Sequence, residues 1–229
     1  MTALAAAGLV LRAGPRVFLD GAGLALAAGE VGALVGAAGC GKSLLVRALC
    51  GLYPSEGEVR VNGVSSRADG WEAVRARTGV LLGAPGLLDD LTVLDNVAWR
   101  LRRQRLPEDQ VRTRVGGLLD EFGLGDAVGK IPAELSGGMQ RRAALARALV
   151  SQPAVLILDD PTAGLDPVTT TGVVQLILGA ARGRGAAVLW TTHDLAGVAA
   201  RAHRVWVMRG GRLDALAGDA GGWAAELAA

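Results

Sequence analysis

Residues 36–43, GAAGCGKS, have the composition and spacing of a phosphate-binding loop. They match G-x-x-x-x-G-K-[ST], with a short apolar run before them and a helical pattern after them. Glycines let the backbone N–H groups face one anion, and the helix N-terminus adds partial positive charge. Lys42 would then reach the outer phosphates of a nucleoside triphosphate, and the Ser43 hydroxyl would bind Mg²⁺. The predicted loop site consists of Gly36, Gly39, Cys40, Gly41, Lys42 and Ser43.

A chance glycine cluster is the alternative explanation, because the chain contains 34 glycines. The lysine argues against it. Lys42 and Lys130 are the only lysines among 24 basic residues, and one of them stands where a compact cation is required.

Two acidic residues follow a second apolar run. Residues 155–158 read VLIL, and Asp159 and Asp160 come directly after them. A buried parallel strand would deliver both carboxylates to the edge of a sheet where ligands bind. Asp159 is predicted to hold Mg²⁺ through water, and Asp160 to orient an attacking water.

A second anion-seeking helix start lies at Ser136, Gly137 and Gly138, ahead of a helical stretch. The chain has one phosphate loop and therefore binds one nucleotide, so this second anion-binding helix end needs a ligand from elsewhere. The simplest arrangement is a head-to-tail dimer, in which each copy's Ser136 segment closes over the nucleotide of the other.

The elements around these motifs alternate between strand and helix, which indicates an α/β fold. Strands are predicted from residue 2 to 11 and at 31–35, 155–158, 186–191 and 205–208, and a hairpin turn at Asn62-Gly63 after 58–61. A helix is predicted over 42–52. Helical patterns dominate from 91 to about 150, as expected for an inserted helical subdomain.

Composition narrows the possible partners. The 229 residues carry a net charge of +2, too little excess for wrapping nucleic acid. No run approaches the roughly 18 apolar residues of a membrane span. The cysteines, Cys40 and Cys50, are too few for a disulfide framework, which suggests a reducing compartment.

The motifs resemble, in order, those of the nucleotide-binding subunits of ABC transporters, from about Leu9 to Leu216. Besides the loop and the Asp159 strand, LSGGMQ at 135–140 resembles the signature and AGLD at 163–166 the D-loop. The resemblance implies one ABC ATP-binding domain over 1–229, a P-loop NTPase of ABC type. It comprises a RecA-like core (1–87 and 153–229) with an N-terminal antiparallel β portion, and a helical subdomain (88–152). It also implies that Asp166 supports the dimer contact and that His193 contacts the γ-phosphate.

The sequence around the signature is also similar to the ATPases of Mla and Mce systems, as are Leu91-Thr92-Val93-x-x-Asn96-Val97 and Gly164-Leu165-Asp166-Pro167. This similarity implies phospholipid transport between membranes, transmembrane permease subunits, an Mce-type lipid-binding protein, and a peripheral place on the cytoplasmic face of the inner membrane. The alternatives are a small-solute importer or drug exporter, a soluble ABC protein of DNA repair or translation, and a degenerate ATP-binding regulator.

Three positions depart from the family pattern. Asp160 replaces the usual glutamate, and Gly83 replaces the Q-loop glutamine. The adenine-stacking aromatic near residues 12 and 13 is missing, so that either Arg12 or Phe18 would take its place. We therefore expect slow hydrolysis or unusual coupling to the membrane partner. The alternatives for the arginines at 100, 102, 103 and 105 are contact with that partner, contact with anionic lipid headgroups, and a solvated helix face, which we favour.

Overall fold

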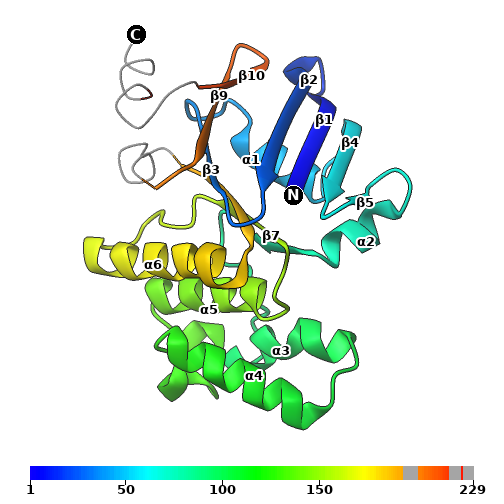
Figure 1. The fold of residues 1–229 in the computed structure, drawn as a ribbon. Coiled ribbons are helices and arrows are strands. Elements are labelled where there is room, and N and C mark those ends of the chain that lie inside the picture. Colours follow the sequence, from blue (N-terminus) through cyan, green and yellow to red (C-terminus); the bar gives the residue numbers. More distant parts are fainter. Residues whose placement is uncertain (193–200, 217–222, 224–229) are drawn as a thin grey trace.

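The computed structural model describes residues 1–192, 201–216 and 223, and within them the chain forms an α/β fold with two sheets (Figure 1). One sheet has four strands in the order β2-β1-β4-β5, and the other has six in the order β10-β9-β3-β8-β7-β6. The strands are β1 (Thr2–Ala13), β2 (Arg16–Ala27), β3 (Val31–Val35), β4 (Glu56–Val61), β5 (Val64–Ser65), β6 (Thr78–Leu81), β7 (Val155–Asp159), β8 (Ala187–Thr191), β9 (Arg204–Arg209) and β10 (Arg212–Ala215).

The six-stranded sheet is parallel through its centre. β3 pairs with β8 and with β9, β8 with β7, and β7 with β6, all in the parallel sense, while β10 pairs antiparallel with β9. Every residue of β3, β7 and β8 is buried. This agrees with the prediction from their unbroken apolar runs, since parallel strands are covered on both faces. The carboxyl ends of β3, β8, β7 and β6 therefore meet at one edge.

Alternate residues of the central strands belong to two separate apolar cores. Ala33 and Leu158 lie in one, and Leu34 and Ile157 in the other. Because side chains of a strand point alternately to opposite faces, the two cores lie on opposite sides of the sheet. The first core includes residues of the helices drawn below the sheet in Figure 1, and the second includes α1 and the inner faces of β1 and β2.

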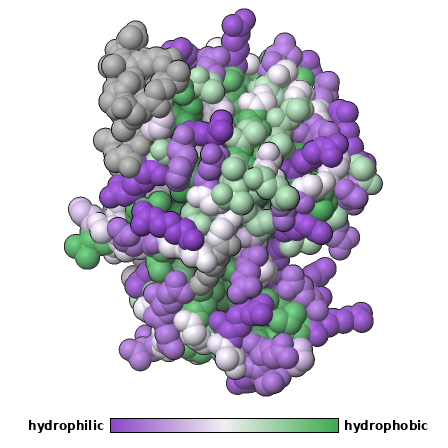
Figure 2. Space-filling view, in the orientation of Figure 1, coloured by the Kyte–Doolittle hydropathy of each residue, from purple (hydrophilic) through white to green (hydrophobic). Residues whose placement is uncertain are grey.

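The four-stranded sheet is antiparallel. β1 pairs with β2 from Thr2 opposite Ala27 to Ala13 opposite Arg16. The turn between β4 and β5 lies at Asn62 and Gly63, which have φ 49° and 84°, so the predicted hairpin turn is confirmed. Figure 2 shows a pale green, apolar area over β1 and β2, with hydrophilic residues in purple around it.

The helices are α1 (Lys42–Leu49), α2 (Gly70–Arg75), α3 (Val93–Arg103), α4 (Glu108–Glu121), α5 (Gly137–Leu149) and α6 (Pro167–Arg184), with short 3-10 turns η1 (Gly125–Ala127) and η2 (Pro132–Glu134). The helix that starts at Lys42 was predicted to reach residue 52 but ends at Leu49, because Gly51 has φ 65°.

α3, α4 and α5 fill most of the predicted helical insertion. The division into a core and a subdomain at residues 88 and 152 stays a prediction. Within the described residues, no helix combines the length and apolarity needed to cross a membrane.

Candidate functional site

The phosphate loop lies between the end of β3 at Val35 and the start of α1 at Lys42. Gly36 has φ 155°, and a Cβ there would lie 2.6 Å from the Met208 carbonyl oxygen. Gly41 has φ 112°, and a Cβ there would lie 2.7 Å from Cδ1 of Phe18. Both positions combine a backbone conformation that favours glycine with a close approach of neighbouring atoms. The shape of this loop therefore requires glycine at positions 36 and 41.

Lys42 holds its ammonium group inside the loop. The side chain is 6% exposed, and Nζ donates to the carbonyl oxygens of Gly36 at 2.7 Å and Ala37 at 3.1 Å. A compact cation with three donors suits this position, because it can turn from carbonyl oxygens to phosphate oxygens. Ser43 is the next residue on α1 and is exposed.

The two aspartates stand at the carboxyl end of β7. Oδ1 of Asp159 accepts a hydrogen bond from Oγ1 of Thr191 at 2.7 Å, and the backbone N–H of Asp160 donates to the same Oγ1 at 3.0 Å. Thr191, the last residue of β8, is fully buried. Its hydroxyl thus orients the first carboxylate and fixes the backbone of the second. Sequence reasoning missed this threonine, and the available signal was its place at the end of an apolar run.

One cavity of about 490 Å³ brings these elements together, a volume typical of small-molecule sites. Its lining includes Gly39, Gly41, Lys42, Ser43, Asp159 and Asp160 from the predicted site. It also includes Ala13, Phe18, Ala38, Leu44, Gly83, Ala163 and Thr191. The strand order explains the convergence, because β3, β8, β7 and β6 end at the same edge of the sheet. Gly36 and Cys40 shape the loop behind this lining.

The predicted signature residues lie elsewhere in the described part of the chain. Ser136 is the N-cap of α5, where its Oγ accepts from the N–H of Met139 at 3.3 Å. Gly137 and Gly138 form the first turn, and none of the three lines the cavity. This placement agrees with a segment that serves another copy's nucleotide, which stays a prediction.

Asp166 caps α6 and is exposed. Its Oδ1 accepts from the N–H groups of Val168 and Thr169, both at 3.0 Å. The hydrogen bonds from Thr169 hold the pKa of this carboxyl below its usual value. The carboxylate is thereby kept charged and fixed at the helix start. The predicted His193 lies outside the described residues.

The structure separates the two candidates for adenine stacking. Arg12 forms an ion pair with Glu56 at 2.9 Å and does not line the cavity among the described residues. Phe18 lines it, and the Arg16 guanidinium lies 4.4 Å from the centre of the Phe18 ring. Of the two, Phe18 is the one that lines the cavity, and its contact with a base stays a prediction.

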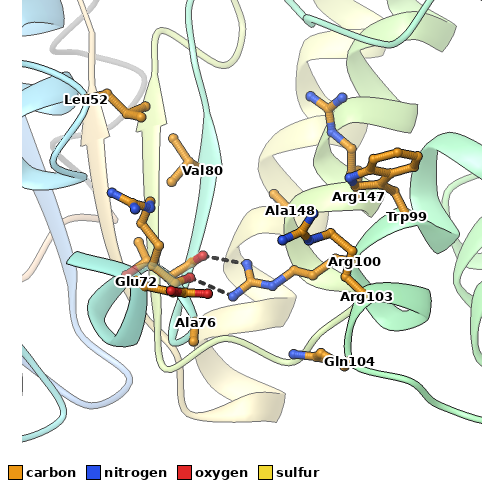
Figure 3. A pocket seen from close by; sticks show the side chains of 12 residues that line it. Leu52, Glu72, Ala76, Val80, Trp99, Arg100, Arg103, Gln104, Arg147 and Ala148 are labelled. Carbon is orange, nitrogen blue, oxygen red and sulfur yellow. Dashed lines mark hydrogen bonds between the residues drawn. The ribbon is translucent and has the colours of Figure 1, made fainter. Parts of the chain in front are cut away.

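A second hollow, of about 590 Å³, lies between α2 and β6 on one side and α3 and α5 on the other (Figure 3). Trp99 and Leu52 line it and are 50% and 53% exposed. Arg100 crosses it, donating to the carbonyl oxygens of Thr78 at 2.7 Å and Arg75 at 2.6 Å (Figure 3). Burial lowers the pKa of Arg100. This groove therefore combines exposed apolar surface with fixed positive charge.

The arginines at 100, 102, 103 and 105, in α3 and just after it, make different contacts. Arg102 bonds Asp95 at 2.7 Å and Glu108 at 2.8 Å and so stabilises the helices themselves. Arg103 lines the groove together with Arg100, and Arg105 is exposed. That any of them meets a membrane partner stays a prediction.

Comparison with known proteins gives one family. The family described as ABC transporter matches residues 19–163. The methionine import ATP-binding protein MetN of Caulobacter vibrioides is 40% identical over 199 residues, covering 85% of this chain and 60% of that protein. MetN of Rhodopseudomonas palustris is 39% identical over 201 residues, covering 86% and 54%. The chain thus spans little more than half the length of these curated relatives.

Two solved structures share the fold over nearly the whole chain. CbiO1 from Clostridium perfringens is described as part of the ABC transporter complex cbiONQ. It has a TM-score of 0.85 at 30% identity, and the match covers 99% of this chain and 92% of the CbiO1 chain. The ATP-binding cassette MJ0796, a dimeric structure of a post-hydrolysis state bound to ADP and Pi, has a TM-score of 0.83 at 26% identity. The match covers 94% of this chain and 99% of the MJ0796 chain.

Proposed function

Because this chain belongs to the ABC transporter ATP-binding family, whose members are ATPases, we propose that it powers the import of a small solute by binding and hydrolysing MgATP. The observation that carries the proposal is the convergence of the phosphate loop, Lys42, Asp159 and Asp160 on one cavity. The methionine importers among its relatives support a solute of the amino-acid class.

The cavity offers each group that phosphate chemistry needs. Lys42 would move from its loop carbonyls to the outer phosphates, and the loop N–H groups would bind the inner ones. Ser43 and Asp159 supply oxygen donors at the same wall, and Mg²⁺ prefers one or two such ligands together with substrate phosphates. Bound there, the ion would neutralise charge that develops on the phosphates. Asp160 would hold the attacking water.

Hydrolysis in this arrangement is slow. Asp160 is one methylene shorter than glutamate, and its backbone is held by Thr191, so the carboxylate stands back from the phosphates. A degenerate regulator that binds ATP without turnover is the second candidate, favoured by the same residue and by Gly83. Turnover by the assembled complex separates the two.

A second copy would complete the site. Ser136, Gly137 and Gly138 form a helix start that does not line this chain's own cavity, which suits closure over the nucleotide of a head-to-tail partner. Asp166, fixed at the start of α6, would support the contact between copies. We place His193 at the γ-phosphate by resemblance alone.

The groove of Figure 3 is the surface we assign to the transmembrane partner, which keeps the chain peripheral to the membrane. Its exposed Trp99 and its arginines suit a partner segment that is apolar at its centre and acidic at its rim. The expected phospholipid cargo and Mce-type partner find no support among the relatives. A partner that binds an amino acid fits them better.

The test is to purify the chain from native membranes in mild detergent and to identify the accompanying proteins and small molecules by mass spectrometry. A permease with an amino-acid-binding protein supports the proposal. A permease with an Mce-type protein and phospholipid would overturn the cargo and leave the ATPase intact. An Arg103→Glu variant should lose the permease, whereas Arg182→Glu on exposed α6 should keep it.

A further inference from the structure

The side chain of Arg141 joins three segments around the nucleotide cavity. It comes from α5 and is 7% exposed. Its Nη1 donates to the Gly83 carbonyl oxygen at 2.8 Å and its Nη2 to the Ala163 carbonyl oxygen at 3.1 Å. Gly83 follows β6 and Ala163 follows β7, and both line the cavity. One guanidinium thus connects α5 to two walls of the site.

The charge of this guanidinium also acts on the cavity. No carboxylate among the described residues lies within ion-pairing distance of Arg141, although buried charges in proteins are usually paired. Burial lowers its pKa, and the charges of Asp160 and Asp159 oppose that effect. The group stays protonated. A fixed cation therefore lies near Asp159 and Asp160, the two carboxylates that line the cavity.

Gly83 can make this connection only through its backbone. A Cβ at this position would lie 3.7 Å from Oδ2 of Asp159, so a side chain here would lie against the predicted metal ligand. Glycine has none, and the polar link from this wall to α5 is supplied by Arg141 instead. The helix that carries it begins at Ser136, the segment assigned above to the second copy's nucleotide.

We propose that Arg141 is a positioning residue that couples nucleotide binding in the cavity to movement of α5. The inference rests on the proposed function, because it requires that the cavity binds nucleotide. A nucleotide that shifts the Gly83 and Ala163 walls displaces the guanidinium, and the guanidinium displaces α5 together with its Ser136 end. A long side chain at position 83 could bond α5 directly. Because position 83 is glycine, Arg141 makes this bond from α5 instead.

The test is hydrogen exchange of the full chain with and without saturating MgADP, in the wild type, Arg141→Gln and Arg142→Gln. Arg142 is the matched control, because it is also an arginine of α5 whose side chain bonds a backbone carbonyl. That carbonyl belongs to Phe122, at 3.0 Å, which does not line the cavity. In the wild type and in Arg142→Gln, MgADP should slow exchange in both the phosphate loop and α5, by about fivefold in α5. In Arg141→Gln the loop should remain protected while α5 loses the effect.

Equal responses of α5 in the two variants would overturn the coupling role and leave the proposed function standing. A wild-type phosphate loop without protection at saturating MgADP would overturn the proposed function, and this inference with it. If Arg141→Gln does not fold, Arg141→Lys carries the same comparison, because it keeps the buried cation and removes the forked geometry that spans two carbonyl oxygens.

Discussion

Replacing Asp160 by glutamate should speed ATP hydrolysis and destabilise the fold at the same time. The backbone N–H of Asp160 donates to Oγ1 of Thr191 at 3.0 Å and to its carbonyl oxygen at 3.2 Å, and these hydrogen bonds hold the main chain in place. One added methylene extends the carboxylate by about 1.5 Å. Since a misplacement of about 1 Å can cost about 100-fold in rate, we expect kcat to rise roughly 10- to 100-fold.

The stability effect has the opposite sign and comes from the backbone. Asp160 has φ 46°, in the left-handed region, which aspartate tolerates better than longer side chains because its short polar group can bond locally. Glutamate should cost about 1 kcal/mol there. For a domain of this size, the melting temperature should fall by about 2–4 °C.

The assay is steady-state hydrolysis with Mg²⁺ by the chain assembled with its membrane partner, combined with thermal melting and nucleotide affinity. Asp90→Glu, in an exposed loop, is the control and should change none of these quantities. The reasoning fails if the wild type already turns over about 10 times per second or faster and Asp160→Glu gives no gain. A melting temperature that rises would refute the backbone argument separately.

Other expected outcomes concern binding and stability. Asn96→Ala should lower the free energy of unfolding, measured in urea, by about 3 kcal/mol. The buried amide of Asn96 makes four hydrogen bonds to backbone groups of residues 88, 91 and 92, and all four would be lost. Gln104→Ala, at an exposed position, is the control and should change this free energy by less than about 0.5 kcal/mol. Burial raises the pKa of Cys50 to about 12. Since its thiol ionises near pH 9 when unfolded, folding stability should fall between pH 9 and 12 by up to about 1.4 kcal/mol per pH unit, and Cys50→Ala should remove that slope. Lys42→Met should weaken ATP binding about 10- to 100-fold in a fluorescence titration while the melting temperature changes little, and unchanged affinity would contradict its assignment. Bound MgATP should slow alkylation of half-buried Cys40, which lies against Lys42 Nζ; an unchanged rate would place the nucleotide elsewhere.

Local patterns were sufficient to predict the phosphate loop and most of the strands, but they did not predict β2, β6 or β10. The run at 31–35 is unbroken, apolar and followed by glycine, and it is β3. Asp159 and Asp160 were recognised for the same reason, as acids after such a run. The helix from Lys42 was predicted too long because the glycine at 51 was read as part of the helix, whereas it is where the chain turns out of it.

Contacts between distant segments could not be predicted in this way. Thr191 lines the cavity, and Arg141 bonds two of its walls, because of the order of the strands and the crossing of α5, and no spacing along the chain records either. The ion pair between Arg12 and Glu56 could not be predicted for the same reason, because the two residues meet only where β1 pairs with β4. Composition and periodicity describe each element, and the site depends on how the elements are ordered.

The position of β3 determines when this protein can fold during its synthesis. Val31 pairs with Val188 and Ala33 with Val205, so the central strand is made early and its two neighbours are made near the end. At roughly 5–20 residues per second, β3 waits on the order of 10 s for β8. Until then both of its edges lack the strands that pair with them, while α3, α4 and α5 can form from contacts close in sequence. The sheet that carries the phosphate loop is therefore completed late, and a nascent chain stalled before residue 187 holds the loop motif without the sheet that shapes it.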